Sequence, residues 1–141
     1  MGTDSHKLVS AQHRHQIVQI NALQDELMRH KPDLKRVRAL FAEAVDEIVT
    51  HMRLEEEDVF PDLERLLPTE ERPIERLREE HKVLMTASAQ VAEDLSRNDL
   101  PGRTLDDTVA FVRLYRLHTA IEEWLIALAL KSRPDGPPPA P

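Results

Sequence analysis

The sequence predicts an all-α protein, an up-down-up-down four-helix bundle, and two observations carry that prediction. Proline and other turn residues divide the 141 residues into four long segments, roughly 6–30, 33–67, 70–97 and 104–132. Within these segments hydrophobic residues recur at steps of three and four, and the alternating pattern of a strand is absent. Amphipathic helices joined by short loops bury their apolar faces well as a bundle.

The segment boundaries also predict where helices begin and bend. We expect one domain over residues 1–132, followed by a proline-rich tail at 133–141 that holds five of the ten prolines. Thr69 and Thr104 are expected to cap the third and fourth helices, because a threonine hydroxyl accepts a hydrogen bond from a free backbone N–H. Pro61 lies inside the second segment and is expected to bend that helix.

Composition limits the classes of function. The chain has no cysteine, which excludes disulfides, thiolate metal sites and a cysteine nucleophile. Its three glycines are too few for a glycine-rich phosphate loop, and its net charge of −7 argues against nucleic acid as a partner. The sequence contains neither a hydrophobic N-terminal signal nor an apolar run of membrane-spanning length. We therefore expect a cytoplasmic protein without a membrane partner, either monomeric or weakly homo-oligomeric.

Five ionisable residues stand where the helical pattern calls for apolar side chains. They interrupt the core stripes of the second, third and fourth segments, and they are His51, Glu55, His81, His118 and Glu122. Burying them without partners would cost several kcal/mol. A metal ion would compensate for that cost, and imidazole and carboxylate are ligands that both iron and zinc accept.

The spacing of these residues favours one shared site. A histidine followed by glutamate four residues later places both side chains on one helix face. His15 and His51 are separated by 36 residues, and His81 and His118 by 37. Two helical hairpins would thus contribute the same set of ligands at the same depth, which suits two metal ions bridged by two carboxylates.

The first segment offers two candidate histidines, His13 and His15. We predict His15 as the ligand, because its helix face is shared by Leu8, Ala11, Val18 and Ala22. His13 remains the alternative, since Ile17 and Ile20 support a stripe through it.

Other side chains near these motifs have two interpretations each. Tyr115 lies one turn before His118 and is a candidate catalytic residue, with core packing as the alternative. Glu56 could help to bridge the metals or lie on the surface, and Glu80 could orient a ligand histidine or lie on the surface. Surface positions are expected for Glu57, Glu123, His6 and His30.

Four stretches, HRHQI, HMRLEEEDVFP, EEHKVL and HTAIEEW, resemble the hemerythrin-like (HHE cation-binding) domain family. The likeness covers residues 10–130 and implies a non-haem diiron site, bridged by carboxylates and an oxo or hydroxo group, with zinc as an alternative metal. Carried over by position, the nitrogen ligands would be His15, His51, His81 and His118, and the bridging carboxylates Glu55 and Glu122.

One departure from the family bears on the reaction. Oxygen-carrying members have a further histidine four residues after the third-segment histidine, where this chain has Met85. The missing ligand implies an open or water-filled iron position and favours reaction with oxygen species, with peroxide decomposition as the most concrete form. Dioxygen, hydrogen peroxide or nitric oxide are the expected partners. Iron or oxygen sensing, binding or storage without catalysis is the alternative.

Overall fold

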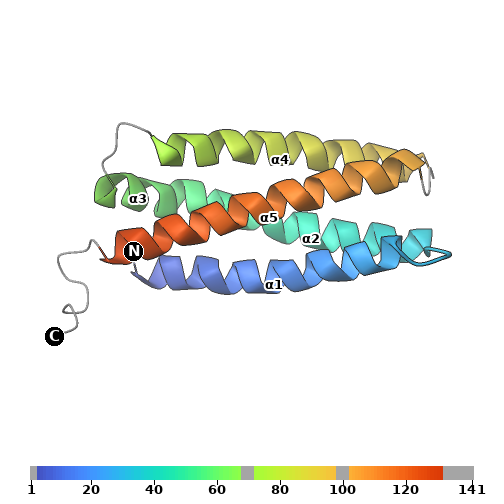
Figure 1. Ribbon diagram of the computed structural model, residues 1–141, viewed down its shortest axis with the longest axis horizontal. Coiled ribbons are helices and arrows are strands. Elements are labelled where there is room, and N and C mark those ends of the chain that lie inside the picture. The colour runs from blue at the N-terminus through green and yellow to red at the C-terminus, as the bar shows by residue number, and fades with distance from the viewer. Residues whose placement is uncertain (1–2, 68–71, 98–101, 132–141) are drawn as a thin grey trace.

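The computed structural model describes residues 3–67, 72–97 and 102–131, which form an all-helical bundle (Figure 1). No strand occurs in these residues, so the predicted fold class is confirmed. The elements are α1 (Thr3–Leu27), α2 (Leu34–Leu54), the π-helix η1 (Glu55–Val59), α3 (Phe60–Leu66), α4 (Pro73–Ser96) and α5 (Gly102–Lys131). Thr69 and the predicted tail at 133–141 lie outside the described residues.

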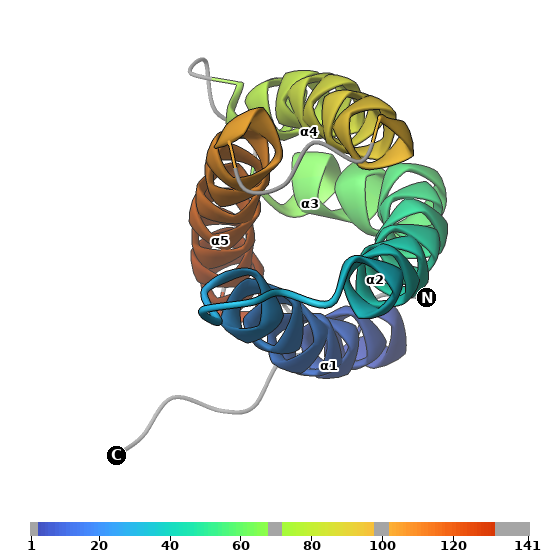
Figure 2. The same ribbon diagram turned by 90° about the vertical axis from the view of Figure 1, so that its right-hand side faces the viewer.

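The four arms are α1, the continuous run of α2, η1 and α3, then α4, and α5. The arms of each hairpin pack together, α1 with α2 and α4 with α5, and α1 also packs against α5 to close the bundle (Figure 2). Within the part of the chain that the structure describes, none of the helices has the length and apolarity needed to cross a bilayer.

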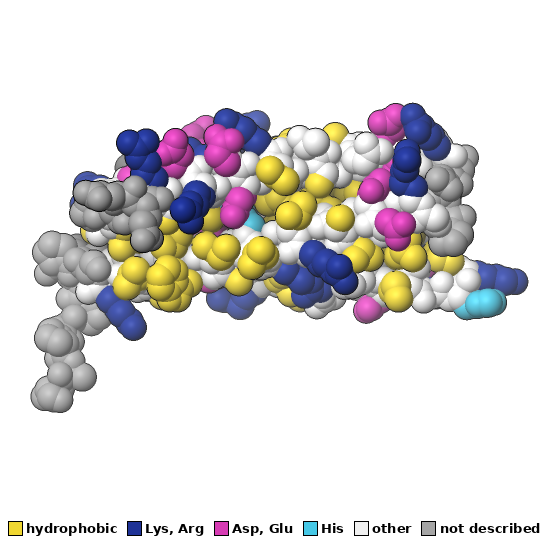
Figure 3. Space-filling view, turned by 45° about the horizontal axis from the view of Figure 1, so that its top comes forward, with side chains coloured by type: hydrophobic (Ala, Val, Ile, Leu, Met, Phe, Trp, Pro, Cys, Tyr) yellow, Lys and Arg dark blue, Asp and Glu magenta, His cyan; other side chains and the backbone are white. Residues whose placement is uncertain are grey.

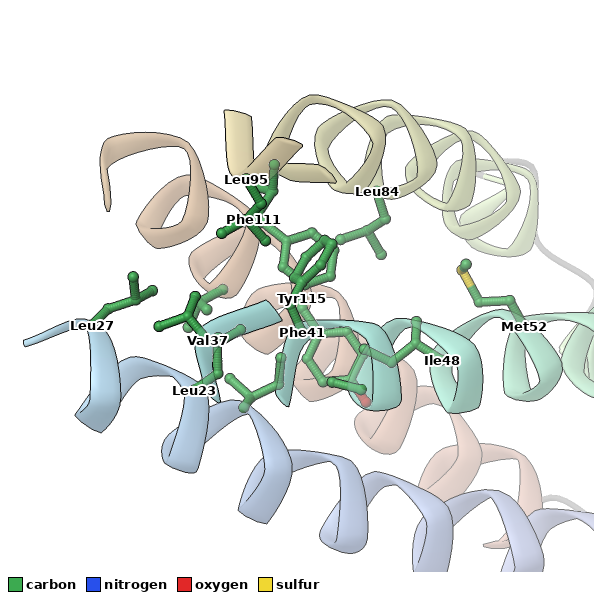
Figure 4. Close-up of a cluster of buried hydrophobic side chains, with 14 residues drawn as sticks. Leu23, Leu27, Val37, Phe41, Ile48, Met52, Leu84, Leu95, Phe111 and Tyr115 are labelled. Atoms are coloured by element: carbon green, nitrogen blue, oxygen red, sulfur yellow. The ribbon is translucent and has the colours of Figure 1, made fainter. Parts of the chain in front are cut away.

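Two hydrophobic clusters fill the bundle at different depths. One contains Phe41, Phe111 and Tyr115 (Figure 4), and the other contains Phe60 and Leu77. Each arm carries buried histidine or glutamate side chains that lie, in sequence, between residues of one cluster and residues of the other. They are His13, His51, Glu55, His81, His118 and Glu122. The two apolar clusters therefore enclose a polar layer.

The helix starts follow from local capping chemistry. Asp33 caps α2, because its side chain accepts hydrogen bonds from the backbone N–H groups of Lys35 and Arg36. Pro73 stands in the first turn of α4, where its missing N–H leaves no partner unsatisfied.

Thr104 does not cap the fourth long helix, and that expectation was wrong. The helix α5 begins at Gly102, which has a positive φ of 33°, so Thr104 falls inside the first turn. Thr104 is fully buried, and its carbonyl oxygen accepts a hydrogen bond of 2.7 Å from the Thr108 hydroxyl.

The structure accommodates Pro61 with a π turn, where the sequence predicted only a bend. Proline has no N–H, and in an α-helix its ring clashes with the carbonyl group four residues earlier. In η1 the turn widens, and the N–H of Phe60 donates to the carbonyl oxygen of Glu55, five residues earlier. The extra residue brings both Val59 and Phe60 into the core while Glu55 stays fully buried.

The Phe60 ring provides a test of this packing. Phe60→Ala is expected to lower the free energy of unfolding by about 3–5 kcal/mol, because the ring is fully buried and its removal leaves a cavity. Val18→Ala, at an exposed position of α1, is the matched control and should change it by less than about 0.5 kcal/mol. Urea denaturation measures both, and equal losses in the two variants would contradict the packing described.

Candidate metal centre

Four histidines and two glutamates converge in the polar layer between the two hydrophobic clusters. Each of the six is at most 4% exposed. They form two groups, each with its ligating atoms within 4.8 Å of one another, and both groups include Glu55 and Glu122. The first group adds His13 and His51, and the second adds His81 and His118.

The structure corrects the assignment in the first helix, because it places His13 and not His15 in the buried group. The His15 side chain is 61% exposed, and its Nε2 atom lies 3.2 Å from Glu47 on the outside of the bundle. Two residues along a helix correspond to nearly opposite faces, so only one of the two histidines can point inward.

The physical reason for this error lies in the apolar residues of α1. Leu8 and Val18, which favoured His15, are themselves exposed, whereas Val9 and Ile20 are fully buried on the side of His13. Apolar residues occur on both faces of α1, so composition alone could not orient the helix.

In the first group, nitrogen and oxygen atoms lie within contact distance of one another. The Nε2 atoms of His13 and His51 are 2.8 Å apart. Glu122 Oε1 lies 2.9 Å from His13 Nε2, and Glu55 Oε1 lies 3.1 Å from His51 Nε2. The second oxygen of Glu55 is 3.7 Å from His13 Nε2.

The second group repeats this arrangement with the same two carboxylates. The Nε2 atoms of His81 and His118 are 3.2 Å apart. Glu55 Oε1 is 3.3 Å from His81 Nε2, and Glu122 Oε2 is 3.0 Å from His118 Nε2. Each carboxylate therefore reaches both histidine pairs, which is the placement that a bridging ligand requires.

In each of these four histidines the other ring nitrogen faces an oxygen from a neighbouring arm. A carboxylate or amide oxygen accepts a hydrogen bond, so each Nδ1 carries the proton and donates, and this assigns the lone pair to Nε2. The acceptors are Glu123 for His13 (2.8 Å), Gln12 for His51 (2.6 Å), Glu56 for His81 (3.1 Å) and Glu80 for His118 (2.7 Å).

Sequence reasoning recovered only part of this outer set. The sequence pattern does not single out Gln12, it predicts a surface position for Glu123, and it allows two positions each for Glu56 and Glu80. Glu56 belongs to neither group of converging ligands, so the structure gives it the Nδ1 contact in place of a bridging position. Each of the four acceptors is the immediate sequence neighbour of a residue in the groups, and that adjacency was the available signal.

The charges of the buried groups follow from these contacts. Burial raises the pKa of Glu55, but the close contacts of its oxygens with the imidazoles of His13, His51 and His81 outweigh burial and hold that pKa well below its usual range. Burial lowers the pKa of His118, and the hydrogen bond to Glu80 opposes that effect only in part. Burial also lowers the pKa of His13, but its bonds to Glu123 and Glu55 dominate and raise it.

This donor set fits a pair of cations. The carboxylate oxygens of Glu55 and Glu122 are buried and, within the described part of the chain, have no hydrogen bond of good geometry. The four Nε2 lone pairs are directed toward these oxygens and toward one another. Two cations would satisfy the lone pairs and the anionic oxygens together.

Tyr115 and His6 lie outside the two groups. Tyr115 is buried in the hydrophobic cluster of Figure 4, and its hydroxyl donates to Gln16 Oε1. Burial raises the pKa of Tyr115, the Thr119 hydroxyl opposes the rise, and the negative charge of Glu55 adds to it. His6 was expected on the surface but is 1% exposed, with its Nε2 atom 3.0 Å from Asp62 of α3.

A pocket of about 510 Å³ opens beside the second group. His81 lines it, and so does Met85, one helical turn further along α4. The remaining lining residues come from α2, η1 and α4 and include Val49, Met52, Arg53 and Lys82. Small molecules therefore have space next to one of the buried histidines.

Comparison with known proteins supplies the family. The Hemerythrin HHE cation binding domain matches residues 4–129, a range that contains the whole polar layer. Comparison with curated proteins and with solved structures gave no match. Since the matched range spans most of the chain, and its buried histidines and glutamates converge as a cation site requires, the chain belongs to the hemerythrin HHE cation-binding domain family.

Proposed function

We propose that the chain holds two iron ions in the polar layer and that the loaded protein decomposes hydrogen peroxide. The observation that carries the proposal is the pair of buried ligand groups that share Glu55 and Glu122. Bound iron would supply redox chemistry toward small oxygen species, which nitrogen and oxygen side chains alone do not provide. Zinc is the alternative metal, because imidazole and carboxylate select only weakly among such cations.

In this proposal the histidines divide between the two ions. His13 and His51 would hold one ion, His81 and His118 the other, and Glu55 and Glu122 would bridge them. The two carboxylates would also neutralise part of the positive charge in a layer that excludes water.

The hydrogen bonds at Nδ1 would support the four imidazoles as metal ligands. They orient each ring and make Nε2 a stronger donor, because three of the four acceptors are carboxylates. Such support favours the more highly charged state of a bound metal.

Met85 and the adjacent pocket support reaction with peroxide over stable oxygen carriage. A thioether is a poor ligand for hard ferric iron, so Met85 would leave the neighbouring position available. The pocket would admit a molecule as small as hydrogen peroxide to the side of His81.

Tyr115 is the proposed proton donor of the site. Its raised pKa means that the phenol would give up its proton only to a strong base formed beside it, and the influence of the Glu55 charge places it within electrostatic reach of the ligands. The hydrogen bond to Gln16 would hold the hydroxyl in position.

Binding of dioxygen or nitric oxide without turnover is the second candidate function. The almost complete burial of all six side chains favours it, because a shielded centre protects a bound gas from water. In either case we propose that the protein acts in the cytoplasm.

Metal analysis of two neighbouring variants tests the ligand assignment. Wild-type protein expressed with iron should carry close to two iron ions per chain. His13→Ala should lose at least about half of that iron, since it removes a nitrogen donor from one ion and leaves buried carboxylates uncompensated. His15→Ala, two residues away and exposed, is the control and should keep full content. Iron loss in His15→Ala alone would refute the assignment.

The outer hydrogen bonds give a second test. Glu80→Gln should lower iron affinity by about 10–100-fold, because a neutral acceptor supports the His118 imidazole less well than a carboxylate. Glu47→Gln, next to the exposed His15, is the matched control and should leave affinity unchanged. Competition with a chelator measures both affinities, and identical values for the two variants would refute a role for Glu80.

Peroxide consumption tests the reaction itself. Oxidised wild-type protein should release oxygen from hydrogen peroxide, and the reduced protein should form no long-lived oxygen adduct in stopped-flow spectra. Met85→His should slow turnover at least about tenfold and lengthen the life of the adduct, because an added imidazole would fill the available position.

The control for that experiment is Val83→His, which adds a histidine to α4 outside the pocket that His81 lines. It should behave as wild type, and Tyr115→Phe should keep its iron while turning over more slowly. A reversible oxygen complex in the wild type, with peroxide consumption no faster than that of free iron, would refute the catalytic proposal and favour binding alone.

A further inference from the structure

The outward face of α5 carries a continuous apolar stripe. Of the ten exposed large hydrophobic side chains in the described residues, five lie on this helix. Leu117 is 61% exposed and Trp124 is 64% exposed, and Leu114 and Ile121 lie beside them. Figure 3 shows hydrophobic side chains gathered in a band across this face of the bundle. A contiguous exposed apolar patch commonly marks an interaction site, whereas exposed hydrophobic residues that are scattered singly do not.

The spacing of the stripe is that of a helix-pairing seam. Leu114, Leu117, Ile121 and Trp124 are separated by alternating steps of three and four residues. The same steps continue outward to Asp107 at one end and Lys131 at the other. At roughly 1.5 Å per residue this stripe is about 36 Å long, and a second helix with the same spacing is the partner that fits it.

We propose that this stripe, which runs from Asp107 to Lys131 in alternating steps of three and four residues, is a homodimer interface. In this interface α5 packs antiparallel against α5 of a second copy. In that register Leu117 faces Ile121 of the second copy, and Leu114 faces Trp124 of the second copy. The pairing is self-complementary, as a twofold dimer requires. The inference is independent of the metal and of the reaction proposed above.

Charge complementarity selects this orientation and this occupant. The antiparallel register brings Asp107 of each copy opposite Lys131 of the other, at both ends of the seam. A parallel pair would place Asp107 against Asp107 and Lys131 against Lys131, which is repulsive. Asp107 also lies beside Asp94, whose hydrogen bond raises the pKa of Asp107, so a lysine from a second copy would offset an unfavourable acidic pair.

Small residues border the seam on one side. Ala120 and Ala127 are exposed next to the large apolar side chains. In the antiparallel register Ala120 lies one residue from the twofold axis, where its small side chain allows the two helices to approach closely.

The first experiment measures mass and tryptophan emission together. Wild-type protein should sediment at twice the 16.2 kDa chain mass. Trp124, the single tryptophan, should shift its emission to longer wavelength on dilution as it becomes hydrated. Leu117→Glu should weaken dimerisation at least about 100-fold, because it buries two carboxylates in an apolar seam. Val83→Glu, at an exposed hydrophobic position of α4, is the control and should remain dimeric.

The second experiment tests the register by charge reversal. Lys131→Asp and Asp107→Lys should each weaken dimerisation about tenfold, since each creates like charges at both ends of the seam. The double variant should recover the wild-type association, which only the antiparallel register allows. Circular dichroism verifies that every variant is folded.

Three results would overturn the proposal. One is a monomer for the wild type across the micromolar range, and another is a dimer that Leu117→Glu leaves intact. The third is a double charge variant that associates no better than the single variants. If the monomer dimerises once residues 133–141 are removed, those residues cover the stripe in the full chain. That result is a case of the first one and equally overturns a dimer of the full chain.

Discussion

The structure depends on one electrostatic constraint, the burial of two anionic carboxylates among four imidazole nitrogens inside an apolar bundle. The shortest distances between the carboxylate oxygens of Glu55 and Glu122 and the histidine Nε2 atoms are 2.9–3.3 Å, which is the range of a hydrogen bond. Such a layer is costly without a cation, because buried charge must be compensated at short range. The hydrophobic clusters on both sides supply the burial that makes those contacts strong, and the metal would supply the compensation.

The orientation of the imidazoles comes from a cyclic set of contacts between arms. Gln12 of α1 contacts a histidine of α2, and Glu56 of η1 contacts one of α4. Glu80 of α4 contacts one of α5, and Glu123 of α5 closes the cycle on α1. Each arm therefore positions a histidine of another arm, so bundle packing and ligand geometry depend on each other.

Much of the fold and part of the site could be predicted from the helical period. His51, Glu55, His81, His118 and Glu122 interrupt an apolar stripe, and the structure buries and clusters all five. That inference succeeded because a residue at a core position of a helix must face the core whatever surrounds it. The outer acceptors were harder to find, because a half-exposed glutamate beside a ligand has the same sequence pattern as ordinary surface charge.

By itself the sequence determined the number of helical arms, the family, and the level at which polar residues enter the core, since these depend on period, spacing and breakers along one chain. Tertiary structure alone decided that His13 and not His15 turns inward, because α1 carries apolar residues on both faces and its rotation is set by packing against α2 and α5. It also decided that Pro61 is accommodated by a π turn, because widening the turn keeps Phe60 in the core and Glu55 in the polar layer.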